Sequence, residues 1–128
     1  MWHQYILNPE ALTSLFKEIP DLSHIVLHEV VLERQGEFIS LRFDLDQFPL
    51  SAPDAWSEYN TVQVVLQIIQ TSSLFIKGWQ SPLSGILNVS LKEEETYQLT
   101  FESVGCAIDI EAAGIRLEKV SAYKNGTV

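Results

Sequence analysis

The fold is decided by an alternating stretch at residues 39–45, which reads ISLRFDL. Successive side chains of a strand point to opposite faces, so the apolar side chains of this stretch share one face and the polar ones share the other. This pattern is typical of an antiparallel strand with one face on the core and the other in water. Residues 23–34 are rich in leucine and β-branched residues, and Gln35-Gly36 predicts a tight turn between the two stretches. We therefore expect a hairpin whose inner face belongs to the core.

Strand patterns continue along most of the chain. The most apolar run, residues 61–71, carries apolar side chains on both faces, which indicates a central position in a sheet. Further strands are expected at residues 74–79, 86–92, 96–103, 106–112 and 115–122. The breaks between them are short, and short connections favour antiparallel neighbours because parallel strands need long crossovers.

One short amphipathic helix is expected before the strands. Asn8 can cap it, Pro9 suits its first position, apolar side chains recur at helical spacing up to Ile19, and Pro20 ends it. The sequence thus predicts an α+β fold that is mainly antiparallel β, with about eight strands in a curled or two-layer meander sheet and one N-terminal helix. We expect residues 1–128 to form a single domain, since we find no repeat or linker.

Composition restricts the setting of the protein. The chain has 128 residues, 46% of them hydrophobic, which is enough to bury a core without a disulfide or a metal. The lone Cys106 cannot form an internal disulfide, which favours a reducing compartment. Because the sequence shows neither a signal peptide nor an uncharged apolar run of about 20 residues, we expect a cytoplasmic protein with no membrane contact.

The charge is strongly acidic. Seventeen acidic and eight basic residues give a formal net charge of −9. Residues 1–64 hold ten acidic and three basic side chains, and so carry −7 of that charge. Contacts to phosphates need clustered Lys and Arg, so we expect no nucleic-acid partner. An acidic surface either keeps a domain soluble or steers a basic partner toward it.

The search for catalytic motifs argues against an enzyme. The sequence contains none of the common motifs for a nucleophilic serine, a phosphate loop, a dinucleotide or a catalytic zinc. On one strand His24 and His28 would have Cα atoms about 13 Å apart, too far to share an ion. Cys106 alternates with apolar residues, which predicts a buried, inert thiol. We therefore expect no catalytic residues, no metal and no cofactor.

An acidic loop is the main candidate for binding a partner. Pro49, Pro53 and several acids interrupt the strand pattern over residues 47–60, which predicts a long loop with a short helical turn near Ala55. The candidate contact residues in and beside this loop are Asp44, Asp46, Asp54, Trp56, Glu58 and Tyr59. Exposed aromatic side chains among charges resemble interface anchors, but the aromatics can instead fold inward and pin the loop. Trp79, at a strand end, is expected to pack on the core.

A further set of residues runs in a characteristic order nearly from end to end. It consists of Trp2, residues 8–12 (NPEAL), 15–16 (LF), 19–22 (IPDL), 41–43 (LRF), 53–56 (PDAW), 59–63 (YNTVQ), 76–79 (IKGW) and 120–123 (VSAY). In this order the chain resembles the immunity protein 50 family, whose members are encoded beside toxins in bacterial polymorphic toxin systems.

The resemblance implies a cytoplasmic, non-enzymatic antidote that binds a cognate toxin domain and occludes its working surface. The acidic charge suits a basic toxin domain. Because the family supplies no binding residues, the six candidate residues are inferred from their chemistry. Another candidate surface is the wet side of the predicted sheet, with Gln98, Thr100, Glu102, Asp109 and Glu111.

Two other functions stay open at this point. The first is a β-module that binds a sugar or a lipid in a barrel mouth or cleft lined by Trp56, Tyr59 and Trp79. The second, and the weaker, is a hydrolase that uses Asp44 and Asp46, which lie two apart on a strand and share a face but lack a partner base.

Overall fold

The computed structural model describes residues 1–80 and 83–126 of the chain. Its helical elements are a 3-10 turn η1 (Trp2–Tyr5), one α-helix α1 (Glu10–Leu15) and a 3-10 turn η2 (Asp54–Trp56). Its strands are β1 (Ile25–Glu33), β2 (Phe38–Asp44), β3 (Thr61–Lys77), β4 (Ser84–Glu93), β5 (Thr96–Glu102) and β6 (Ala107–Tyr123). No helix among the described residues is both long and apolar enough to cross a membrane.

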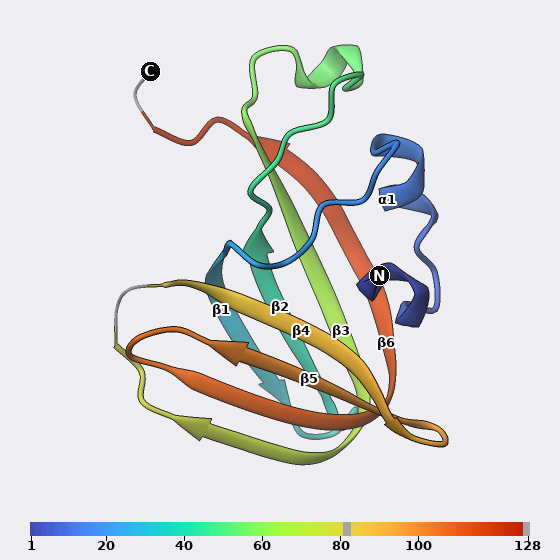
Figure 1. The fold of residues 1–128 in the computed structure, drawn as a ribbon, viewed down its shortest axis with the longest axis vertical. Helices are drawn as coiled ribbons and strands as arrows, with labels where there is room; N and C mark the ends of the chain where they lie inside the picture. Colours follow the sequence, from blue (N-terminus) through green and yellow to red (C-terminus); the bar gives the residue numbers. More distant parts are fainter. Residues whose placement is uncertain (81–82, 127–128) are drawn as a thin grey trace.

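The strands form one closed antiparallel barrel in the order β1-β2-β3-β6-β5-β4. The long strands β3 and β6 pair from Thr61↔Tyr123 to Lys77↔Ala107 and bend together, so that each contributes to two layers (Figure 1). The first half of β3 pairs with β2, and the first half of β6 pairs with β5. The mainly antiparallel, curled sheet predicted from the sequence is therefore confirmed.

The predicted inner face of the hairpin is also confirmed. Ile39, Leu41 and Phe43 of β2 are buried, and they lie opposite Leu32, Val30 and Leu27 of β1. In the next strand the alternate residues Val62, Val64, Leu66 and Ile68 are buried as well. Alternation with a period of two thus places one continuous apolar face inside the barrel.

The number of strands is lower than expected. Residues 71–73 were expected to turn, but β3 runs through them with a bulge between Thr71 and Ser73. Likewise β6 runs through Ala113-Gly114, where a break was expected. The prediction of about eight strands is wrong because polar and small residues in these two strands mark bends rather than ends. The sequence pattern predicts two consecutive strands in each of these regions, but β3 and β6 are each a single bent strand.

The N-terminal helix is shorter than expected. Helix α1 ends at Leu15, and Phe16 already has an extended backbone with φ −116° and ψ 126°. The expected cap is wrong too, because Pro9 occupies the N-cap position. The amide of Asn8 instead pairs with β6: Nδ2 donates to the Leu117 carbonyl at 2.9 Å, and Oδ1 accepts from the Leu117 N–H at 2.7 Å. Asn8 thereby acts as a short substitute for a neighbouring strand.

The barrel closes at a narrow junction. Within the described residues β1 and β4 pair at only two positions, Ile25↔Gly85 and Val26↔Ser84. One further backbone bond, from Leu27 N–H to the Leu83 carbonyl, extends the junction. Beyond this bond the outer edge of β1 has no strand partner in the described part of the chain. We call this stretch the open seam, formed by residues 27–33, Leu74, Trp79 and Leu83.

Candidate partner-binding surfaces

The loop between β2 and β3 is held in place by its own aromatic residues. Trp56 is half-buried, and its ring centroid lies 6.2 Å from that of Phe48. Pro49 is buried, and Pro53 precedes the 3-10 turn η2 that contains Ala55. The predicted helical turn is therefore present. Trp56 pins the loop, which agrees with the inward alternative considered for the aromatic residues of this segment.

Four of the six candidate contact residues lie exposed on this one loop. Asp46, Asp54 and Glu58 are exposed, and Tyr59 is 42% exposed. We call these four residues the acidic loop surface. The loop carries three carboxylates and one amphipathic ring on a segment whose interior is packed. This is a chemistry suited to contacting a basic protein surface.

Asp44 does not belong to the acidic loop surface. It is only 4% exposed, and it lies on the outer side of β2 among side chains from three neighbouring strands. Its Oδ2 accepts hydrogen bonds from His28 Nε2 at 2.7 Å and from the Tyr123 hydroxyl, and its Oδ1 accepts one from Gln63 Nε2 at 3.1 Å. The expectation that Asp44 is a direct surface contact is wrong, because these donors cover its carboxylate.

The Asp44 network also affects the acidity of Tyr123. Burial of the phenol and its hydrogen bond to the carboxylate raise the pKa of Tyr123 from 10.0 to about 12. The phenol therefore stays a neutral donor to Asp44 at physiological pH. The network joins β1, β2, β3 and β6 at one end of the barrel, so it serves the fold. The hydrolase hypothesis loses its acid pair, since Asp44 is covered and Asp46 is exposed.

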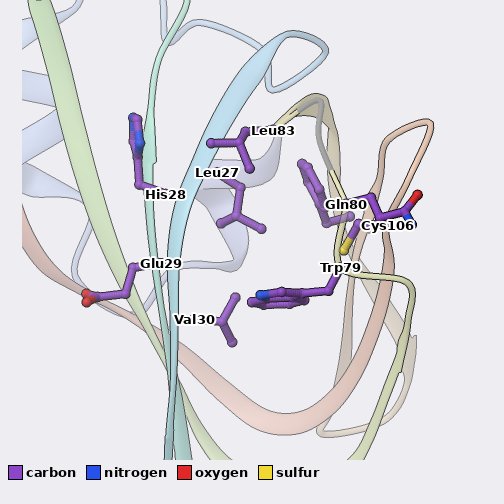
Figure 2. A pocket seen from close by; sticks show the side chains of 9 residues that line it. Leu27, His28, Glu29, Val30, Trp79, Gln80, Leu83 and Cys106 are labelled. Atoms are coloured by element: carbon purple, nitrogen blue, oxygen red, sulfur yellow. The ribbon is translucent and has the colours of Figure 1, made fainter.

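The open seam holds a small hollow beside β1. The hollow has a volume of about 100 Å³ and an apolar lining that includes Leu27, Val30, Leu83 and Phe101. Figure 2 shows Leu27 and Val30 pointing toward Trp79 across this hollow, whereas His28 and Glu29 point to the other side of β1. His28 and Glu29 nevertheless line the hollow, so it is their backbone that forms this part of its wall.

Trp79 is held in the seam by two glycines. Gly78 has a positive φ of 78°, and a Cβ there would lie 2.4 Å from the Gly105 carbonyl oxygen, which only glycine avoids. The Gln80 N–H donates to the same carbonyl at 3.2 Å. This close approach presents the indole of Trp79 outward beside β1. Trp79 is 66% exposed, so the expectation that it packs on the core is wrong.

A second hollow continues along β1 toward the hairpin turn. Apolar residues Leu32, Phe38, Ile39 and Leu74 line it together with Glu33, Arg34, Glu37 and Thr71. Leu32 is 56% exposed and Leu74 is 39% exposed, although each lies opposite a buried residue of the next strand, Ile39 and Ile110 respectively. Sequence reasoning missed this surface. The one sequence feature that points to this surface is the large number of apolar residues in β1 and β3. From the sequence alone, apolar residues on such a surface look the same as apolar residues of the core.

The outer face of β5 and β6 is a flatter alternative surface. Gln98 lies opposite Glu111 and Thr100 opposite Asp109, as the alternation predicts. The amide of Gln98 donates to Asp109 at 3.0 Å, and Lys92 forms an ion pair with Glu111. Much of the charge on this face is therefore already paired within the protein. Glu102 remains exposed at its edge.

The three aromatic residues of the predicted small-ligand cleft do not line one hollow. The described residues contain no group of three or more His, Cys, Asp or Glu side chains placed to hold a metal. Burial raises the pKa of the Cys106 thiol, so this residue is a poor nucleophile at neutral pH. Trp79 lines the smaller hollow, but neither Trp56 nor Tyr59 does. The hollow that Trp79 lines has a volume of about 100 Å³, below the roughly 300–1,000 Å³ of typical ligand pockets. The second hollow is larger, at about 560 Å³, but none of the three aromatic residues lines it.

Comparison with known proteins gives one match. The family model described as Immunity protein 50 matches residues 8–123, nearly the whole chain. The matched region contains all six strands, the acidic loop surface and the open seam. No curated protein and no solved structure matches the chain.

Proposed function

Since the chain belongs to the immunity protein 50 family, we propose that it neutralises a cognate toxin domain by binding it and occluding its working surface. The observation that carries this proposal is the family match, which spans every element of the barrel. The partner is a basic protein domain, the binding takes place in the cytoplasm, and the immunity protein itself makes and breaks no covalent bond.

The acidic loop surface supports a steering role. Its carboxylates Asp46, Asp54 and Glu58 are exposed on a chain of net charge −9. Charges of this kind raise the rate of encounter with an oppositely charged partner. Tyr59 presents a large, rigid ring beside them and is suited to anchoring the complex. Trp56 acts indirectly, because its packing on Phe48 fixes the loop that carries these contacts. Asp44, covered by its donors, stabilises the strand from which the loop leaves.

Occlusion requires an interface of ordinary size. A stable complex between two proteins buries about 1,200–2,000 Å² in total. The whole chain exposes 7903 Å², so such an interface would take about a tenth of its surface if the two partners contribute equally. The four residues of the acidic loop surface make up only a part of that area, so the interface must also include residues around them.

The test is neutralisation of the toxin encoded in the adjacent gene. Cells that express the toxin domain alone are expected to stop growing, and co-expression of this chain is expected to restore growth. Purified chain and catalytically inactivated toxin domain are expected to elute together in gel filtration. Failure of both rescue and co-elution would overturn the proposal. A second immunity protein of unrelated sequence serves as the control for specificity.

A further inference from the structure

The open seam leaves surface of the barrel interior in contact with water. Leu32 and Leu74 point inward, since they pair with the buried Ile39 and Ile110, yet they are 56% and 39% exposed. The exposed Trp79 and Leu83 line the smaller hollow, and Leu32 and Leu74 line the second one; we call these four side chains beside β1 the apolar strip. Contiguous apolar surface rimmed by polar groups marks an interaction site in soluble proteins.

We propose that the open seam binds an extended segment of the toxin, which pairs with the outer edge of β1 as an added strand. This inference rests on the proposed function and names a surface through which it is carried out. Leu27 and Val30 point from β1 into the smaller hollow, so apolar side chains of an added strand would meet them there. Residues 30–33 of β1 have no backbone partner on this side within residues 1–80 and 83–126. An unpaired edge of this kind is the usual acceptor of an added strand.

The residues along the seam define the chemistry of the added strand. Side chains of a strand alternate between two faces, so every second side chain of the segment points into the barrel against Val30, Leu32 and Leu74. These inward positions require apolar residues. The side chains between them point outward beside Glu29 and Glu33 of β1, which face away from the core. Glu29 already forms an ion pair with Arg42 of β2. Opposite charges across neighbouring strands are stabilising, so the outward position beside Glu33 favours Lys or Arg.

A second copy of this chain is a poor occupant of the seam. If two β1 edges paired antiparallel around Val31, Glu29 of each copy would lie opposite Glu33 of the other. Like charges directly opposite one another destabilise strand pairing. The net charge of −9 on each copy adds to this repulsion. A basic, apolar-alternating strand avoids both costs, and this complementarity points to the toxin rather than to self-association.

Hydrogen exchange on the unaltered protein tests the location of binding. The probe is the catalytically inactivated toxin domain from the adjacent gene, added to the full chain. Within residues 29–33, the alternate amides whose N–H points away from β2 are expected to exchange at least about tenfold more slowly in the complex, because only these groups can bond to the added strand. Strong protection confined to residues 46–59, with residues 29–33 unchanged, would overturn the inference and leave the proposed function intact.

Matched leucine variants test the apolar strip. Leu32→Asp, in the seam, is expected to weaken binding of the toxin domain by at least about tenfold, as is Trp79→Ala. Leu91→Asp is the control, because Leu91 is 49% exposed on β4 and lines neither hollow of the seam. It is expected to leave the affinity unchanged within about twofold. Circular dichroism checks the fold of each variant, and if Leu32→Asp fails to fold, the exchange measurement still decides.

The remaining outcomes separate the two proposals. Equal affinities of Leu32→Asp, Trp79→Ala and the unaltered chain would show that the seam is not the docking site, while the toxin is still bound. A dimer of the free chain that Leu32→Asp dissociates would mean that a second copy covers the seam, and would also overturn the inference. Absence of any binding to the toxin domain would overturn both the inference and the proposed function.

Discussion

Single residues show how cross-strand contacts change the role of a side chain. Asp44 stands at a polar position of an alternating strand, so the sequence predicts an exposed carboxylate. In the folded chain His28, Gln63 and Tyr123 reach it from three other strands and cover it. Their convergence depends on the pairing of β3 with β6, which no local pattern encodes. Among the residues that the structure describes, the exposed acids Asp46 and Asp54 have no such donors, and for them the local pattern was sufficient.

Replacement of Asp44 is expected to destabilise the fold. Asp44→Ala leaves three donors without their acceptor and should lower the free energy of unfolding by about 2–4 kcal/mol. Asp44→Asn should cost less, about 1 kcal/mol, because its carbonyl can still accept from His28 and Tyr123 while the Gln63 amide turns over. Urea denaturation measures both changes. Asp46→Ala is the control and should stay within about 0.5 kcal/mol of the unaltered chain. An equally small effect of Asp44→Ala would contradict the structural role of the network.

Tyr123 predicts a loss of stability at alkaline pH. Its pKa is raised from 10.0 in the unfolded chain to about 12 in the folded one, so the folded state holds the phenol proton more tightly. The resulting stabilisation is fully present below pH 10 and is lost as the pH rises through the folded pKa of about 12. The urea concentration at the midpoint of unfolding, measured from pH 8 to 12, should therefore decrease once the pH exceeds 10. In Tyr123→Phe this midpoint should decrease less steeply. Identical slopes for the two proteins would exclude this role for Tyr123.

At the scale of elements, the sequence predicted the hairpins better than the ends of the strands. Apolar alternation identified β2 and the first half of β3 correctly, because their inner residues are buried without exception. The bends of β3 and β6 could not be predicted in this way. Ser72, Ser73 and Gly114 are typical of turns, but long-range pairing between the two strands keeps them extended. Similarly, Asn8 suits a helix cap by its local sequence, and its actual partner lies 109 residues away.

The clamp of Asn8 on β6 is expected to stabilise the edge of that strand. Asn8→Ala removes both hydrogen bonds to Leu117, which is buried, and should cost about 1–3 kcal/mol. Asn60→Ala is a matched control, since Asn60 makes the same pair of bonds to Asn125 at an exposed site, and should cost less than about 1 kcal/mol. Exchange of the Leu117 amide, followed by NMR, should accelerate only in Asn8→Ala. Unchanged protection of that amide would show that the clamp contributes nothing.

At the scale of the whole molecule, charge and apolar surface lie on different parts of the barrel. The acidic loop surface follows the end of β2, whereas the apolar strip follows β1 down to the hairpin turn. Long-range charge governs the rate of encounter, and desolvated apolar contacts govern the lifetime of a complex. The two surfaces are therefore expected to affect different rate constants of toxin binding.

Charge reversal on the acidic loop surface should slow association. Asp54→Lys combined with Glu58→Lys is expected to lower the association rate constant with the toxin domain by about tenfold at low salt and by much less at high salt. The dissociation rate constant should change little. Glu93→Lys combined with Glu94→Lys makes the same change of net charge in the turn between β4 and β5 and serves as the control. Surface plasmon resonance at several salt concentrations measures the constants. Equal slowing in both variants would assign the effect to net charge alone.

The bond between Asn8 and Leu117 has a consequence for how this protein is made. A ribosome adds about 5–20 residues per second, so Asn8 waits roughly 5–20 s for its partner strand to be translated. The pairing of β3 with β6 is delayed in the same way, and a topology with so many distant contacts folds slowly. Throughout that interval the nascent chain exposes apolar strands whose pairing partners have not yet been synthesised. The time at which the folded protein can form is therefore set by the last strand to be synthesised rather than by the first.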